Sequence, residues 1–151
     1  MKLVGIDIAK YEHAAFIMEA STGESLCDPF FFKNNKEGFK KLYTELNKYS
    51  KNELLIGMED TGHYNFAIES SLLAEGYKVA LINPITTKSL RKASLKSVKS
   101  DKEDALLITK ALLDKAYYRI ISIQDEKLKE AKELTRYRTQ LTIEMNRKKN
   151  I

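Results

Sequence analysis

The chain has 151 residues, of which 43% are hydrophobic and 31% are charged, and its formal net charge is +5. This length is enough for one domain with its own core, and this composition excludes an intrinsically disordered protein. No run of about 18 apolar residues is present, so no membrane-spanning segment and no membrane partner are expected. The single cysteine, Cys27, cannot form an internal disulfide, which fits a reducing cytoplasmic location.

The first part of the chain predicts an antiparallel meander of three strands. Leu3–Ile8 is a short apolar run with β-branched residues, which is typical of a buried strand. Ala14–Met18 predicts a second strand, and the turn-forming residues Ser21–Glu24 separate it from a third strand over Cys27–Lys33. Pro29 has no amide hydrogen, so we expect the third strand at an edge of the sheet.

The middle of the chain alternates predicted helices with predicted strands. Apolar residues recur at helical spacing over Lys36–Tyr49, and Leu54–Met58 and Val79–Ile82 are short apolar runs. A second helix is expected between these two strands, from Thr61 to Gly76. This alternation predicts parallel pairing in the second half of an α/β fold. We therefore expect a mixed five-stranded sheet flanked by helices.

The last third of the chain is basic and then helical. The Ser-, Thr- and Lys-rich stretch over 86–100 is expected to form a loop or a short helix, and another helix follows from Lys102. Glu126–Lys149 contains few helix breakers, and its apolar residues approach the three-four spacing of a coiled coil. We expect a globular domain over 1–120 and a helical extension over 121–151 that begins a coiled coil and supports a homo-oligomer.

Basic side chains are concentrated just before and at the start of the helix predicted from Lys102. Between Asn83 and Lys102, six basic residues accompany a single acid, so this stretch carries the same excess of +5 as the whole chain. The six are Lys88, Arg91, Lys92, Lys96, Lys99 and Lys102. Such concentrated charge favours a polyanionic partner such as nucleic acid, and the alternative is a solvated helix face.

Four carboxylates stand at positions where an acid is unusual. Asp7 interrupts an apolar strand, where a carboxylate is costly without a partner. Glu59 follows a strand at its carboxyl end, which is where open α/β sheets bind ligands. Asp101 and Asp104 are three residues apart at a helix start and can share one face, although either one can instead cap the helix. A site built from several carboxylates suits a hard cation such as Mg²⁺ or Mn²⁺.

Three sequence blocks carry a resemblance to a known family. They are Gly-Ile-Asp-Ile-Ala-Lys over 5–10, Glu-Asp-Thr-Gly-His-Tyr over 59–64, and Lys-Ser-Asp-Lys-Glu-Asp-Ala over 99–105. In this order and on these predicted elements, the blocks resemble the DEDD transposases of bacterial insertion sequences and the related Piv-type DNA invertases. The resemblance extends over about residues 2–115.

This resemblance implies a fold, a site and a set of partners. The fold would be ribonuclease-H-like, similar to that of the RuvC-like Holliday-junction resolvases. The catalytic metal ligands would be Asp7, Glu59, Asp101 and Asp104. The implied activity is DNA strand cleavage and exchange with Mg²⁺ or Mn²⁺, guided by a structured RNA. Lys10 and the six basic residues would contact nucleic-acid backbone. Family members also carry a second domain with a nucleophilic serine, and this chain is expected to end before it.

Three other functions are open at this point. A RuvC-like nuclease that acts alone on branched DNA needs the same four acids. A non-catalytic module that binds nucleic acid and dimerises through its helical tail would use the acids only structurally. A sugar-kinase or actin-like ATPase also begins with an apolar strand that carries an acid, but it needs small residues after that acid, and Ile8, Ala9 and Lys10 stand there instead.

Overall fold

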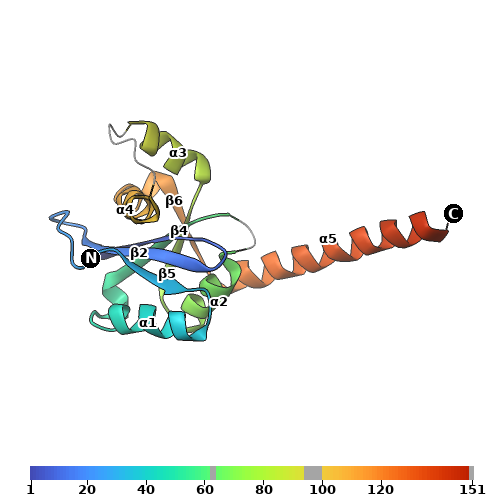
Figure 1. Cartoon of the computed structure of the whole chain (residues 1–151), viewed down its shortest axis with the longest axis horizontal. Helices are drawn as coiled ribbons and strands as arrows, with labels where there is room; N and C mark the ends of the chain where they lie inside the picture. The colour runs from blue at the N-terminus through green and yellow to red at the C-terminus, as the bar shows by residue number, and fades with distance from the viewer. Residues whose placement is uncertain (62–63, 94–99, 150–151) are drawn as a thin grey trace. The chain divides into compact units, whose positions relative to one another are not determined.

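The computed structural model describes residues 1–61, 64–93 and 100–149. Its centre is a mixed six-stranded sheet in the order β3-β2-β1-β4-β5-β6 (Figure 1). The strands are β1 (Lys2–Asp7), β2 (Glu12–Glu19), β3 (Phe30–Lys33), β4 (Leu54–Glu59), β5 (Lys78–Ile82) and β6 (Tyr118–Ile121). β1 pairs in parallel with β4, and β4 with β5, whereas the other pairings are antiparallel. The predicted meander, the edge position of β3 and the parallel second half are confirmed.

Helices cover both faces of the sheet. They are α1 (Lys36–Leu46), α2 (Phe66–Ala74), α3 (Pro84–Ala93) and α4 (Asp101–Ala111), with short 3-10 turns η1 (Lys51–Glu53) and η2 (Lys115–Tyr117). α1 and α2 lie on one face, and α4 lies on the other with α3 beside it (Figure 1). Alternation along β1 serves both faces, because Val4 and Ile6 join the core under α1 and α2 while Leu3 joins the core under α4.

Two glycines let α4 approach the central strands closely. Gly5 of β1 is aligned with Gly57 of β4 in the parallel ladder. A Cβ atom at Gly5 would overlap the Ala105 carbonyl oxygen and the Thr109 hydroxyl, and one at Gly57 would lie 2.6 Å from a methyl carbon of Leu112. The backbone of α4 therefore lies so close to β1 that position 5 has no room for a side chain. This contact sets where the first turn of α4 lies relative to the carboxyl ends of β1 and β4.

The sheet has one more strand than the five that were predicted. β6 pairs antiparallel with β5, so that Ile82 is aligned with Tyr118 and Val79 with Ile121. Only Ile121 of the four β6 residues is buried. The predicted number of strands was wrong because four residues at a sheet edge give almost no periodic signal.

Helix boundaries also differ from the expected ones. The stretch over 86–100, expected as a loop or short helix, overlaps α3, which begins earlier at Pro84, a residue suited to a first helical position. α2 begins at Phe66 with Asn65 at its N-cap, not at Thr61. α4 begins at Asp101, and the Ser100 hydroxyl caps it by accepting a hydrogen bond from the Glu103 amide.

The contacts divide the chain into two units, Met1–Ile121 and Ser122–Ile151. Within the second unit, α5 (Ile123–Lys149) is one helix of 27 residues. Its apolar side chains Leu134, Leu141 and Met145 are exposed in the single chain. Association through this helix, and a domain boundary at residue 120, stay predictions. No helix in the described part of the chain has the length and apolar character needed to cross a membrane.

Gly5→Ala is expected to destabilise the protein more than Gly57→Ala does. The atoms against position 5 include backbone of α4, with the Thr109 nitrogen 2.5 Å away, whereas those against position 57 belong to the flexible Leu112 side chain. Overpacking of this kind costs about 1–3 kcal/mol of stability. The cost for Gly5→Ala should lie at the upper end of this range, because helix backbone cannot move aside as a side chain can. Urea unfolding of both variants measures the difference. Equal stability of Gly5→Ala and the parent would contradict the close approach of α4.

Candidate active site

Asp7 and Glu59 end two adjacent parallel strands on the face that α4 covers. Asp7 is the last residue of β1 and Glu59 the last of β4. Ile6 is aligned with Met58 in the ladder, so the two acids follow directly at the same edge of the sheet. Alternation places both acids on the same side as Gly5, beneath α4. Both are half-buried, which leaves their carboxylates accessible from the end of the sheet.

The first turn of α4 supplies the other two acids. Asp101 is exposed, whereas Asp104 is buried with 8% of its surface exposed. Ser100 is the N-cap, so neither acid is the cap of this helix. Carboxylates in a first turn are stabilised by the helix dipole, which partly offsets the cost of burying Asp104.

The pKa of Asp7 links the four acids into one electrostatic group. Burial is the largest cause that raises the pKa of Asp7, to about 7. The negative charges of Asp104, Asp101 and Glu59 raise it further, whereas Arg91 lowers it. A carboxyl group with this pKa is half-protonated at neutral pH, so the site has a deficit of positive charge. The four acids therefore interact electrostatically, and their joint role as metal ligands stays a prediction.

Two side chains of α3 face the acids. The Arg91 guanidinium donates from Nη2 to Asp104 Oδ1 at 2.5 Å, and the Arg91 side chain is 38% exposed. The Thr87 hydroxyl, which is buried, contacts Glu59 Oε1 in a short hydrogen bond. Thr87 and Arg91 are four residues apart and so lie on one face of α3. α3 therefore presents one hydroxyl and one cation to the acidic cluster.

The contacts with Arg91 and Thr87 direct the carboxylates of Asp104 and Glu59 toward α3. Among the described residues, no three His, Cys, Asp or Glu side chains converge closely enough to hold a metal ion. Asp104 and Glu59 instead have Arg91 and Thr87 as partners. Metal binding by Asp7, Glu59, Asp101 and Asp104 therefore stays a prediction. Thr87 was missed by the sequence reasoning, and its only signal was the four-residue spacing from Arg91.

The predicted nucleic-acid contacts fall into three groups. Lys88 and Lys92 are exposed on α3, whereas Arg91 on the same helix is turned onto Asp104. Lys102 is exposed on α4, and Lys10 is exposed in the turn between β1 and β2, where its ammonium lies 5.0 Å from the ring centre of Tyr11. Lys96 and Lys99 lie outside the described residues, as does His63.

Solved structures of RuvC share this fold. Thermus thermophilus RuvC superposes with a TM-score of 0.54 at 11% identity, covering 80% of this chain and 100% of RuvC. The T. thermophilus RuvC in complex with a Holliday junction substrate gives a TM-score of 0.52 at 14% identity, covering 72% of this chain and 90% of that one. The protein thus has the RuvC-like form of the ribonuclease-H-like fold, as predicted.

The family follows from sequence comparison. The family model DEDD_Tnp_IS110, described as a transposase, matches residues 4–151, so the chain belongs to this DEDD transposase family. The pilin gene-inverting proteins of Moraxella bovis and Moraxella lacunata are each 28% identical to this chain over 109 residues, or 71% of its length. The chain spans about one third of the length of these curated relatives, 33% in each case.

Asp7→Asn is expected to remove a pH-dependent loss of stability. The folded state keeps the Asp7 proton up to about pH 7, whereas the unfolded chain releases it near the ordinary value of 3.8. Between these values the folded state binds more protons, so the parent loses stability as pH rises. In metal-free buffer, the stability of the parent relative to Asp7→Asn should therefore fall from about pH 4 to about pH 7 and then level off.

Urea unfolding across this pH range measures that difference. Asp28→Asn, at an exposed carboxylate outside the cluster, is the matched control. A difference between the parent and Asp7→Asn that does not change with pH would contradict the raised pKa.

Proposed function

We propose that this chain is the catalytic domain for metal-dependent DNA strand cleavage and exchange in transposition. Asp7 is the central ligand of a divalent cation, and Glu59, Asp101 and Asp104 complete the coordination. The observation that carries the proposal is that Asp7 and Glu59 end the adjacent strands β1 and β4 on the face covered by α4, whose first turn carries Asp101 and Asp104. The raised pKa of Asp7 agrees with this placement. Membership of the transposase family and the RuvC-like fold supply the class of reaction.

The donor set suits a hard divalent cation. Enzymes of this family and fold generally depend on divalent metals. All four proposed ligands are carboxylates, which favours Mg²⁺ or Mn²⁺ over softer ions. A bound cation would relieve the repulsion that raises the pKa of Asp7. When bound, it supplies Lewis-acid stabilisation of the charge on a scissile phosphodiester.

Arg91 is the residue that must move for the proposed site to form. Its guanidinium now satisfies Asp104, so it neutralises part of the cluster when no cation is bound. Release of Asp104 to a cation would free Arg91 to bind a phosphate, beside Lys88 and Lys92 on the same helix. In this scheme Thr87 holds the Glu59 carboxylate through its hydroxyl and limits the orientations open to it.

We also propose the nucleic-acid and protein partners with which the whole protein would act. DNA is the substrate, and the basic side chains of α3, together with Lys10 and Lys102, bind its backbone. A structured guide RNA, association through α5, and a second domain that carries a nucleophilic serine complete the recombinase. RuvC, solved with a Holliday junction, supports a second candidate, a nuclease that cuts branched DNA without that domain. Junction cleavage by this chain alone would favour the nuclease.

Mg²⁺ and Mn²⁺ titration followed by thermal unfolding tests the metal site. A ligand that binds only the folded state stabilises it by about 2.7 kcal/mol at a concentration of 100 times its Kd. We expect the parent to be stabilised and both Asp7→Asn and Asp104→Asn to lose this effect, while Asp28→Asn keeps it. A parent that gains no stability from millimolar metal, with or without DNA, would overturn the proposed site.

Arg91→Met is expected to change the metal-free and metal-bound states in opposite directions. Without metal it leaves the buried Asp104 carboxylate unpaired, which costs about 1–3 kcal/mol. With metal it removes the cation that competes for Asp104, so Mg²⁺ should bind more tightly than to the parent. Lys92→Met, at the exposed neighbouring residue, is the control and should change neither quantity. Isothermal titration that gives equal Mg²⁺ affinities for Arg91→Met and the parent would contradict the competition.

A further inference from the structure

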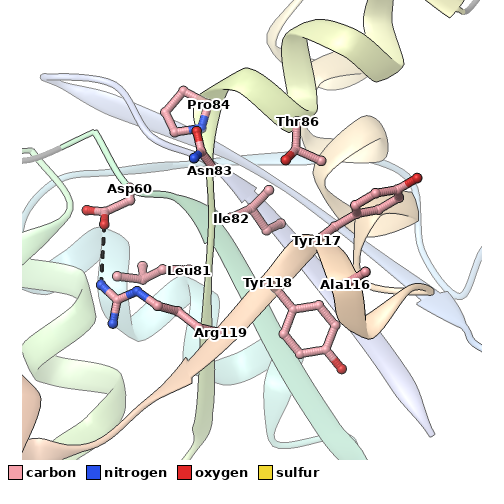
Figure 2. A pocket seen from close by; sticks show the side chains of 10 residues that line it. All are labelled: Asp60, Leu81, Ile82, Asn83, Pro84, Thr86, Ala116, Tyr117, Tyr118 and Arg119. Carbon is pink, nitrogen blue, oxygen red and sulfur yellow. Dashed lines mark hydrogen bonds and ion pairs between the residues drawn. The ribbon is translucent and has the colours of Figure 1, made fainter.

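An open groove of about 610 Å³ lies beside the acidic cluster, at the carboxyl end of β5. Asp60 and Arg119 form one side of it, and Tyr117 and Tyr118 form the other (Figure 2). Asn83 and Thr86, where β5 leads into α3, lie at its upper end (Figure 2). No residue of this groove is among those proposed to bind metal.

Two residues that line the groove are sequence neighbours of residues in or against the acidic cluster. Asp60 directly follows Glu59, and its amide donates to the Ile82 carbonyl oxygen at 3.0 Å. Thr86 directly precedes Thr87, whose hydroxyl contacts Glu59. Arg119 is aligned with Leu81 on the α1-α2 face, whereas Glu59 is aligned with Ile82 on the α4 face, so a strand bound in the groove would pass the carboxyl end of β5 to reach the acids.

The groove offers the groups that bind a nucleotide. Tyr117 lines the groove and is 38% exposed as a residue, and an exposed aromatic side chain can stack on a planar base. The Asn83 side-chain oxygen accepts a hydrogen bond from the Ile85 amide, so its NH₂ group is the donor available to a base edge. The volume lies within the range of about 300–1,000 Å³ that is usual for small-molecule sites.

Arg119 supplies a positive charge for a phosphate. Its Nη2 lies 3.3 Å from Asp60 Oδ2, and its side chain is 59% exposed. An ion pair exposed to solvent in this way contributes little to holding an arginine in place. The planar guanidinium has five N–H donors and binds phosphate in a bidentate manner, so it can engage a phosphate as Asp60 is released.

We propose that this groove binds one unpaired nucleotide of a nucleic-acid strand, with the base on Tyr117 and its phosphate at Arg119. The inference rests on the proposed function for the choice of nucleic acid as ligand, and it adds a strand-positioning site next to the acids. A base inside a duplex is stacked on both sides and cannot reach Tyr117, so the groove selects unpaired nucleotides.

The chain contains no tryptophan, so Tyr117→Trp introduces a single fluorescent reporter into the groove. Oligodeoxyadenylate, oligoadenylate and a blunt DNA duplex are titrated in EDTA, which keeps the acidic cluster free of metal. We expect the single strands to quench the tryptophan and the duplex to leave it unchanged. The deoxyribose and ribose strands distinguish DNA from RNA as the source of the nucleotide. Tyr137→Trp, at an exposed tyrosine of α5, is the matched control and should not be quenched.

Fluorescence anisotropy with a labelled single strand measures affinity independently of the reporter. Tyr117→Ala should weaken binding about 5- to 150-fold, whereas Tyr117→Phe should bind like the parent because it keeps the ring. Arg119→Met should weaken binding and reduce its salt dependence. Thermal unfolding of each variant verifies that it is folded.

The outcomes separate this inference from the proposed function. Strand binding by anisotropy without quenching of Tyr117→Trp, or with equal quenching of Tyr137→Trp, overturns the groove and leaves the metal site standing. Quenching of Tyr117→Trp in a protein that gains no stability from metal supports the groove and overturns the metal site. A parent that binds neither strand overturns the groove as well.

Discussion

The contact between α4 and the glycine pair of the central strands is the constraint on which the site depends. Gly5 and Gly57 are aligned in the β1-β4 ladder and lie beneath α4. A helix held this close to the sheet cannot shift sideways without losing the packing of Ala105 and Thr109. Its first turn is thereby fixed over the carboxyl ends of the two strands. This packing places Asp101 and Asp104 near the carboxyl ends of β1 and β4, where Asp7 and Glu59 stand, and their role as one metal site stays a proposal.

That arrangement concentrates negative charge, and two side chains of α3 reduce the resulting repulsion. Burial and three neighbouring carboxylates raise the pKa of Asp7 to about 7, which signals an incompletely compensated site. α3 contributes Arg91 to Asp104 and Thr87 to Glu59, so one cation and one hydroxyl reduce the repulsion. The same helix exposes Lys88 and Lys92, which places positive charge for a polyanion next to the acids.

The edge strand β6 contributes residues to the groove proposed to bind a nucleotide. By pairing with β5 it brings Tyr117, Tyr118 and Arg119 to the same edge as Asp60 and the start of α3. The groove follows the acidic cluster along the chain, because Asp60 directly follows Glu59. Arg119 is aligned with Leu81 on the α1-α2 face of the sheet, whereas Glu59 is on the α4 face.

The sequence by itself determined the alternation of elements and the parallel half of the sheet, and it singled out four acids as candidates for the site. These features follow from local periodicity and from acids placed where burial makes them costly, and both signals lie within short segments. The tertiary structure alone decided how α4 docks, that a sixth strand exists, and which residues oppose the acids. Arg91 is 13 residues from Asp104, and Thr87 is 28 residues from Glu59. No local pattern specifies such pairs, because they arise only when glycine packing and strand order bring separate elements together.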